Sequence, residues 1–168
     1  MKWLKLVFVT LSLLLTVVIN GQTEGYQMVE LIGLNGEKVN MEMVLRDSIP
    51  VVVFVWRQHD RASCDLVSEL CEIADSVQKA HCIRFVSVIL DDHMQQRTFR
   101  PYIEGQGIDH EVMVDHNGTF GRYFGVDHVP YVIVFGTDDK PIHRSFCRPT
   151  SNPNEMCRQI REAISKHR

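Results

Sequence analysis

The segment Val51–Trp56 constrains the fold of this 168-residue chain more than any other feature. It is a run of six apolar residues, mostly β-branched, directly after Pro50. A strand with one face in solvent alternates apolar and polar residues, whereas a continuous apolar run fits a strand that is covered on both faces. Ile83–Leu90 is a second segment of this kind. The two segments predict the centre of a parallel sheet in an α/β protein.

The segments on either side of the first strand predict a hairpin and a helix. Met28–Leu34 and Lys38–Met43 are strand-like and flank Asn35-Gly36, a dipeptide that tolerates positive φ and makes a tight turn. Cys64–Lys79 has apolar residues at three- and four-residue spacing, which is typical of an amphipathic helix. Strand, helix and strand in this order favour an α/β sandwich with a mixed sheet.

The rest of the chain continues this pattern. The segment Asp91–Gln106 is polar and contains Pro101, so we expect it to be helical only in pieces. The other predicted elements are a strand at Glu111–Val114, a turn at 115–118, a hairpin of Tyr131–Phe135 and Pro141–Phe146, and a helix at Asn154–Lys166.

The N-terminus has the pattern of a secretory signal peptide. Two lysines precede the apolar run Leu6–Ile19, and the small residue Gly21 suits the position before a cleavage site. An uncleaved N-terminal anchor is the alternative and would be the chain's only link to a membrane, but the run is short for a membrane span. We therefore expect a signal peptide at residues 1–21, a single domain at residues 22–168, and a secreted or periplasmic protein.

Charge and composition exclude several classes of protein. The chain has 18 Lys and Arg against 21 Asp and Glu, which gives a net charge of -3. Such a chain has no general attraction to phosphates, and we expect no nucleic-acid partner. Hydrophobic residues make up 45% of the chain, which suits a globular domain and excludes a low-complexity one. We expect no cofactor.

The chain has five cysteines, and an odd number in a secreted protein leaves at least one thiol without an intramolecular partner. Cys147 and Cys157 flank a loop rich in Pro, Ser and Asn and are the easiest pair to join by a disulfide bond, although their spacing does not require it. Cys71 lies on the inward stripe of its predicted helix, and Cys82 opens a buried strand. Cys64 is then the candidate for the odd thiol.

Five segments follow one another in an order that carries a family resemblance: Met28–Val39, Val51–Trp56, Phe85–Asp92, Val112–Gly118 and Tyr123–Phe135. In this order they resemble extracytoplasmic thioredoxin-like proteins of the TlpA/redoxin type, which are related to AhpC/TSA. The resemblance implies a thioredoxin-like three-layer sandwich with a central mixed sheet and an N-terminal β-hairpin extension. It also implies that Pro130, preceded by Val129, is a cis-proline beside the active site.

The chain departs from this family at the position of the redox motif. In the family a Cys-x-x-Cys begins four residues after the tryptophan that ends the strand, at a helix N-terminus where the helix dipole and free N–H groups stabilise a thiolate. Counting from Trp56 places Asp60 and Ser63 at these two positions, and Cys64 lies one residue later. The active site is therefore degenerate, because no register produces a dithiol.

The first hypothesis for the function is that Cys64 acts alone. The protein would then be a relative of thiol-disulfide oxidoreductases that forms a mixed disulfide with a protein thiol or disulfide, or a sulfenic acid. Arg57 and Arg61 would stabilise the thiolate, and Pro130 would shape the groove beside it. The spacing from Trp56 to Cys64 also resembles that of peroxiredoxin-like peroxidases, but Arg57 and Arg61 replace the Pro and Thr of that family.

Two further hypotheses give Cys64 no redox role. Asp60, Cys64 and His128 match the ligand positions of Sco-type copper chaperones, although a hard carboxylate at Asp60 replaces a soft thiolate. Alternatively, Cys64 is a packed thiol without chemistry. The chain would then be a non-catalytic binding module that keeps the groove at Pro130 for an extended polypeptide.

Overall fold

The structure, a computed structural model, describes residues 25–61, 63–67, 69, 83–90, 96–148 and 152–167. Within this part of the chain, no helix has both the length and the apolar character needed to cross a membrane. The elements in chain order are η1 (Gly25–Met28), β1 (Glu30–Gly33), β2 (Lys38–Asn40), α2 (Met41–Leu45), β3 (Val51–Trp56), β4 (Arg84–Ile89), α4 (Gln96–Gly105), β5 (Glu111–Val114), α5 (Thr119–Phe124), β6 (Tyr131–Phe135), β7 (Pro141–Phe146) and α6 (Pro153–Lys166).

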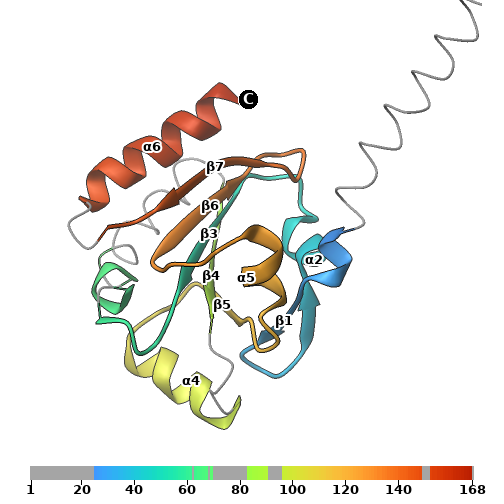
Figure 1. The fold of residues 1–168 in the computed structure, drawn as a ribbon, viewed down its shortest axis with the longest axis vertical. Coiled ribbons are helices and arrows are strands. Elements are labelled where there is room, and N and C mark those ends of the chain that lie inside the picture. The colour runs from blue at the N-terminus through green and yellow to red at the C-terminus, as the bar shows by residue number, and fades with distance from the viewer. Residues whose placement is uncertain are drawn as a thin grey trace, which may run out of the picture.

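The strands form one mixed sheet with the order β2-β1-β5-β4-β3-β6-β7 (Figure 1). The pairs β3·β4 and β4·β5 are parallel, and the other neighbours are antiparallel. The predicted parallel centre, the hairpin of β6 and β7 and the N-terminal hairpin of β1 and β2 are confirmed. Gly36 in the first hairpin has a φ of 85°, the positive value expected for this turn.

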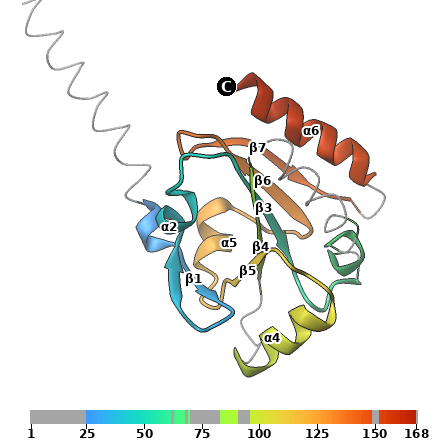
Figure 2. The same ribbon diagram turned by 180° about the vertical axis from the view of Figure 1, so that it is seen from behind.

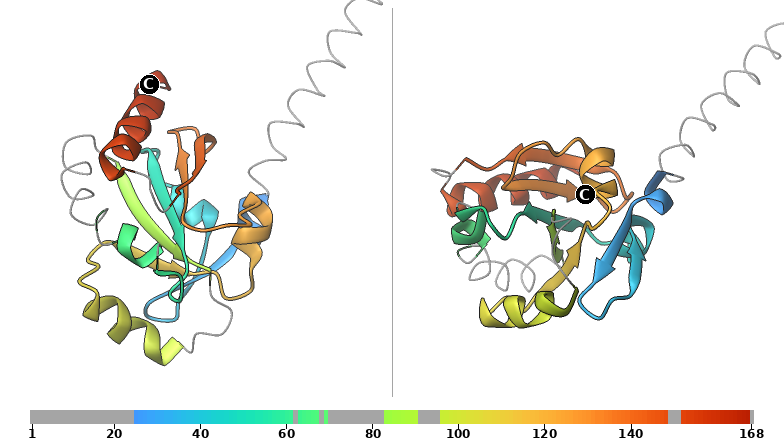
Figure 3. Two further views of the ribbon diagram at one scale, coloured as in Figure 1. Left: turned by 60° about the vertical axis from the view of Figure 1, so that its left-hand side comes forward. Right: turned by 60° about the horizontal axis from the view of Figure 1, so that its bottom comes forward.

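The central strand β3 is buried along its whole length because helices cover both of its faces. On one face, Val52, Phe54 and Trp56 pack in a cluster with the buried side of α6 and with residues 66 and 67. On the other face, Val51, Val53 and Val55 pack in a cluster with α2 and α5. Figures 2 and 3 show α6 and α5 on different sides of the sheet. The predicted three-layer sandwich is confirmed, and the continuous apolar run of β3 follows from it.

The second strand is shorter than predicted. The expected strand Lys38–Met43 ends at Asn40, and Met41–Leu45 forms the helix α2 instead. The Asn40 side chain accepts a hydrogen bond from the backbone N–H of Met43 at 2.9 Å, which caps the helix. The alternating pattern therefore continues past the true end of the strand, because Asn40 favours a helix start.

The helix α4 is continuous through Pro101, whereas the sequence predicted only helical pieces. A proline removes its own backbone donor, but the later hydrogen bonds of the helix persist, including Gln106 N–H to Tyr102 O at 3.0 Å. Ile103 is buried against the sheet cluster, so packing holds this turn in place. Tertiary contacts therefore outweigh the local effect of the proline.

A short helix, α5, follows the predicted turn at 115–118 and was not predicted. The buried carboxylate of Asp115 accepts hydrogen bonds from the backbone N–H groups of Phe120 at 3.1 Å and Gly121 at 2.9 Å. Phe120 and Phe124 face the core. The aspartate satisfies the free donors at the start of the helix, which explains how six residues hold a helical conformation.

Some predictions lie outside the described residues. These are the signal peptide at residues 1–21, most of the helix Cys64–Lys79, and the positions of Cys71 and Cys82. Of that helix, residues 64–67 and 69 are described, and they are helical, as are residues 61 and 63 just before them. The helix Asn154–Lys166 is confirmed as α6, which begins one residue earlier, at Pro153.

Candidate functional site

The candidate site lies at one end of the sheet, where three adjacent strands bring distant residues into a row. Val55 pairs with Tyr131 on β6, and Tyr131 pairs with Phe146 on β7. Beyond these pairs, the backbone N–H of Cys147 donates to the carbonyl of Pro130 at 2.8 Å. The Val129–Pro130 peptide bond is cis. The end of β3, the cis-proline and Cys147 therefore occupy the same edge of the molecule.

Cys64 lies in the first turn of the helix that follows β3. The backbone N–H of Asp60 donates to Arg57 O at 3.2 Å, and the N–H of Cys64 donates to Asp60 O at 3.0 Å. The Asp60 side chain accepts a hydrogen bond from the N–H of Ser63 at 2.7 Å. Asp60 thus acts as the N-cap, in agreement with its residue type. This cap fixes where the helix begins and places Cys64 at its start.

The sulfur of Cys64 is half-buried and surrounded by oxygen atoms. Its Sγ lies 3.2 Å from the carbonyl oxygen of Gln58, 3.9 Å from that of Arg57 and 3.7 Å from the hydroxyl of Tyr102. A carbonyl oxygen accepts a hydrogen bond from a thiol, but it has no proton to give to a thiolate. The Tyr102 hydroxyl can donate, so this group suits the charged form of the sulfur.

Tyr102 is held beside Cys64 by its packing on the end of β3. Its ring lies 6.4 Å from the ring of Trp56, measured between centroids. Burial, together with the hydrogen bond to Cys64, raises the pKa of Tyr102 to about 12. The phenol therefore keeps its proton at neutral pH and remains a donor. The sequence analysis missed Tyr102, because neither its spacing nor its neighbours indicate a contact with residue 64.

The two predicted arginines face solvent. The Arg61 side chain is 95% exposed, and its Nε lies 3.9 Å from Asp65 Oδ2, one helical turn further along. Arg57 is exposed in the loop before the helix. The structure thus pairs Arg61 with a carboxylate of its own helix. Any effect of these charges on Cys64 acts through solvent, where screening weakens it.

The copper-ligand set expected from the resemblance does not assemble. Among the described residues, no group of three or more His, Cys, Asp or Glu side chains is placed to hold a metal ion. Asp60 uses its carboxylate as a helix cap. His128 is exposed, and its ring lies 6.1 Å from that of Phe146. The alternative in which Asp60, Cys64 and His128 form a metal site therefore has no support in this arrangement of the described residues.

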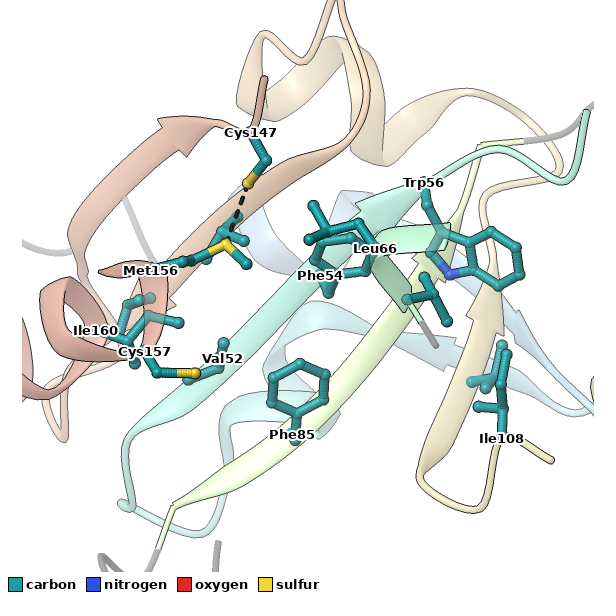
Figure 4. Packing of buried hydrophobic residues seen from close by; sticks show 14 of the residues in the cluster. Val52, Phe54, Trp56, Leu66, Phe85, Ile108, Cys147, Met156, Cys157 and Ile160 are labelled. Atoms are coloured by element: carbon teal, nitrogen blue, oxygen red, sulfur yellow. Dashed lines mark hydrogen bonds between the residues drawn. The ribbon is translucent and has the colours of Figure 1, made fainter. Parts of the chain in front are cut away.

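The disulfide that the spacing of Cys147 and Cys157 permits is not formed, since both residues are free thiols. The Cys147 Sγ instead contacts the Sδ of Met156 at 3.3 Å. Consecutive residues of a helix point about 100° apart, and it is Met156 that faces β7. The Cys157 side chain points toward Val52 in the core (Figure 4). The short separation in sequence suggested a bridge that the orientation of α6 prevents.

Comparisons with known proteins bear on the fold. No family model and no curated protein matches the chain. A thioredoxin-like protein from Porphyromonas gingivalis has a TM-score of 0.71 at 19% identity, with 84% of this chain and 92% of that chain covered. A secreted disulfide oxidoreductase of Mycobacterium tuberculosis, homologous to DsbE, has a TM-score of 0.64 at 12% identity, with coverage of 80% and 96%. StoA from Bacillus subtilis has a TM-score of 0.62 at 11% identity, with coverage of 77% and 92%.

These similarities establish the class of fold. The chain has a thioredoxin-like fold, as the family resemblance implied, and its mixed sheet agrees with the order of elements along the chain. At such low identities the likeness extends to the architecture and not to the chemistry, because unrelated functions share folds.

Proposed function

We propose that the protein is an extracytoplasmic relative of thiol-disulfide oxidoreductases, of the TlpA/redoxin type, whose degenerate site acts through the single thiol of Cys64. The observation that carries this proposal is the half-buried Cys64 Sγ in the first turn of a helix, with the Tyr102 hydroxyl 3.7 Å away. Similar solved structures include a secreted disulfide oxidoreductase and DsbF in mixed oxidised and reduced forms. Residues 1–21 are the signal peptide in this proposal, and residues 22–168 form the exported domain.

The proposed reaction is a disulfide exchange. The Cys64 thiol first loses its proton to solvent, and the thiolate attacks one sulfur of a partner protein's disulfide. The partner's S–S bond breaks as the Cys64–partner bond forms, and the released partner thiolate takes a proton from water. A thiol from a second molecule then attacks the mixed disulfide and frees Cys64. The Tyr102 hydroxyl donates a hydrogen bond to the thiolate, and the groove at Pro130 receives the extended polypeptide.

A non-catalytic binding module is the second candidate, and one observation favours it. The carbonyl oxygens of Gln58 and Arg57 both lie close to the Cys64 sulfur and suit the protonated thiol. In that case the chain keeps the fold and the edge at cis-Pro130 for binding, without a nucleophile.

Alkylation kinetics separate the two candidates. The protein is treated with iodoacetamide at neutral pH, and peptide mapping gives the labelling rate of each cysteine. We expect Cys64 to react faster than glutathione, while buried Cys147 and Cys157 serve as slow internal controls. Glutathione disulfide should also form a mixed disulfide at Cys64 and none in the Cys64→Ser variant. Labelling of Cys64 no faster than glutathione would remove the redox proposal and leave the binding module.

The proposed export has its own test. Expression in a host with a secretory pathway, followed by intact-mass analysis of the exported protein, should give a chain that begins at Gln22. A full-length chain retained in the membrane fraction would contradict cleavage and support the uncleaved anchor.

A further inference from the structure

A cavity of about 240 Å³ lies between the end of β7 and the start of α6. Cys147 and Met156 both line it, and they contribute the only two sulfur atoms among its lining residues. The cavity is smaller than the usual pocket for a drug-sized ligand, which occupies about 300–1,000 Å³. Its small size and the two sulfur atoms in its wall favour a small, soft ligand.

The two sulfur atoms are already in contact. The Cys147 Sγ lies 3.3 Å from the Met156 Sδ, and the two residues are 3% and 5% exposed (Figure 4). A metal–thiolate bond is about 2.3 Å long, so an ion between two sulfurs needs them at most about 4.6 Å apart. The unbranched Met156 side chain has three rotatable bonds and adjoins the cavity, which gives it room to make this small adjustment.

Charge decides which ion fits. Cys147 is buried, so a thiolate without a counter-ion is disfavoured there. A monovalent cation bound to the thiolate forms a neutral unit, which suits the buried sulfur pair, whereas a divalent cation leaves a net positive charge beside Arg148. The rim adds no free carboxylate, because Glu155 forms hydrogen bonds with Arg158 and Gln159. Arg148, also at the rim, opposes additional positive charge.

We propose that this cavity binds a soft monovalent metal ion, Cu(I) or its analogue Ag(I), between the Cys147 Sγ and the Met156 Sδ. Thiolate and thioether ligands favour Cu(I) over harder ions. On binding, the S–H bond of Cys147 breaks, its proton passes to water and an S–metal bond forms, with no electron transferred. The site is separate from Cys64 and does not depend on the redox role proposed for it.

The test uses Ag(I), because it does not change oxidation state. The protein is labelled with [methyl-¹³C]methionine and titrated with Ag(I), and the Met156 methyl signal is assigned with the volume-conserving Met156→Leu variant. This readout reports on the proposed site even when other cysteines also bind silver. We expect the Met156 signal to shift in the wild type and in the Cys157→Ser control, and to stay in place in Cys147→Ser.

Affinity and selectivity complete the test. In competition with a Cu(I) chelator, Cys147→Ser and Met156→Leu should each remove a site or weaken it by at least about tenfold, while Cys157→Ser leaves it unchanged. Zn(II) should leave the Met156 signal in place. The proposal is overturned if the signal never moves once all five thiols are saturated, if it moves equally in Cys147→Ser, or if Zn(II) shifts it as Ag(I) does. A circular dichroism spectrum for each variant shows that it is folded.

Discussion

The hydroxyl of Tyr102 lies 3.7 Å from the sulfur of Cys64, although 38 positions separate the two residues in the chain. The same sulfur lies 3.2 Å from the carbonyl oxygen of Gln58. The carbonyl suits a thiol, and the phenol suits a thiolate. In the proposed function, the balance between these two neighbours determines how readily Cys64 reacts.

Replacement of Tyr102 by phenylalanine tests this balance. The variant keeps the ring that packs on Trp56 and loses the hydrogen bond to the thiolate. Since the site is partly exposed, we expect the Tyr102 hydrogen bond to stabilise the thiolate by about 1 kcal/mol, which is below the usual range for hydrogen bonds to charged groups. The Tyr102→Phe variant should therefore label with iodoacetamide about fivefold more slowly at Cys64 at neutral pH.

The control for that experiment is Tyr123→Phe. Tyr123 is 43% exposed on α5, a helix that packs on the other face of the sheet. The Tyr123→Phe substitution should leave the labelling rate of Cys64 unchanged. An unchanged rate in Tyr102→Phe, or an equal loss in both variants, would show that the phenol does not support the thiolate.

Asp60 is expected to stabilise the helix start. Its carboxylate accepts the Ser63 N–H at 2.7 Å, so Asp60→Ala leaves that donor without its partner. The free energy of unfolding should fall by about 1 kcal/mol, as for other N-cap replacements. Urea denaturation measures the change. Asn is an equally good cap, so Asp60→Asn should lose much less stability than Asp60→Ala. Equal destabilisation by both substitutions would show that the negative charge of Asp60, and not its hydrogen bond, stabilises the helix.

Asp115 is expected to be more important for stability than Asp60, because it is 2% exposed and holds the start of α5. Asp115→Ala leaves the buried N–H of Phe120 and the N–H of Gly121 without their acceptors. We expect a loss of about 2–3 kcal/mol in the free energy of unfolding. Asp115→Asn keeps one acceptor and should lose about half as much. Denaturant titration of the two variants gives the comparison, and a loss below that of Asp60→Ala would contradict the assigned role.

His110 should make stability depend on pH. Its Nε2 lies 2.7 Å from the Oγ of buried Ser87, and burial lowers the pKa of His110 to about 4. Between pH 6.5 and pH 4 the unfolded chain takes up a proton at this residue and the native chain does not. The stability from the neutral imidazole is thus complete above pH 6.5 and declines as the pH falls, by about 3 kcal/mol at most.

The His110→Gln variant tests this assignment by thermal unfolding at a series of pH values. Its stability should change less between pH 6.5 and pH 4 than that of the wild type. His116→Gln, at an exposed position, is the control and should behave as the wild type. Burial also lowers the pKa of His143, so some pH dependence of the same sign should remain. An identical pH profile for His110→Gln and the wild type would exclude the role of His110.

Local sequence patterns predicted most of the strands but fewer of the short helices. Strands such as β3 need only a run of apolar residues, and that signal is contained in the run itself. The helix α2 begins at the capping side chain of Asn40, and α5 is held by Asp115, which lies three residues before its N-cap Gly118. Each of these two side chains is a single residue in a background of similar polar residues. For α4 the difference has the opposite sign: Pro101 predicts an interrupted helix, but packing keeps the helix continuous.

For the candidate site, the sequence by itself predicted a motif without a dithiol and singled out Cys64 as the candidate thiol. In the register that the family resemblance implies, Asp60 and Ser63 take the two motif positions and Cys64 follows them. Only the tertiary structure decided what surrounds each sulfur, with Tyr102 beside Cys64 and Met156 beside Cys147. The reason is physical: local patterns along the chain predict most of the strands, but which side chains face one another depends on how the helices are rotated against the sheet. That rotation is set by packing over the whole core.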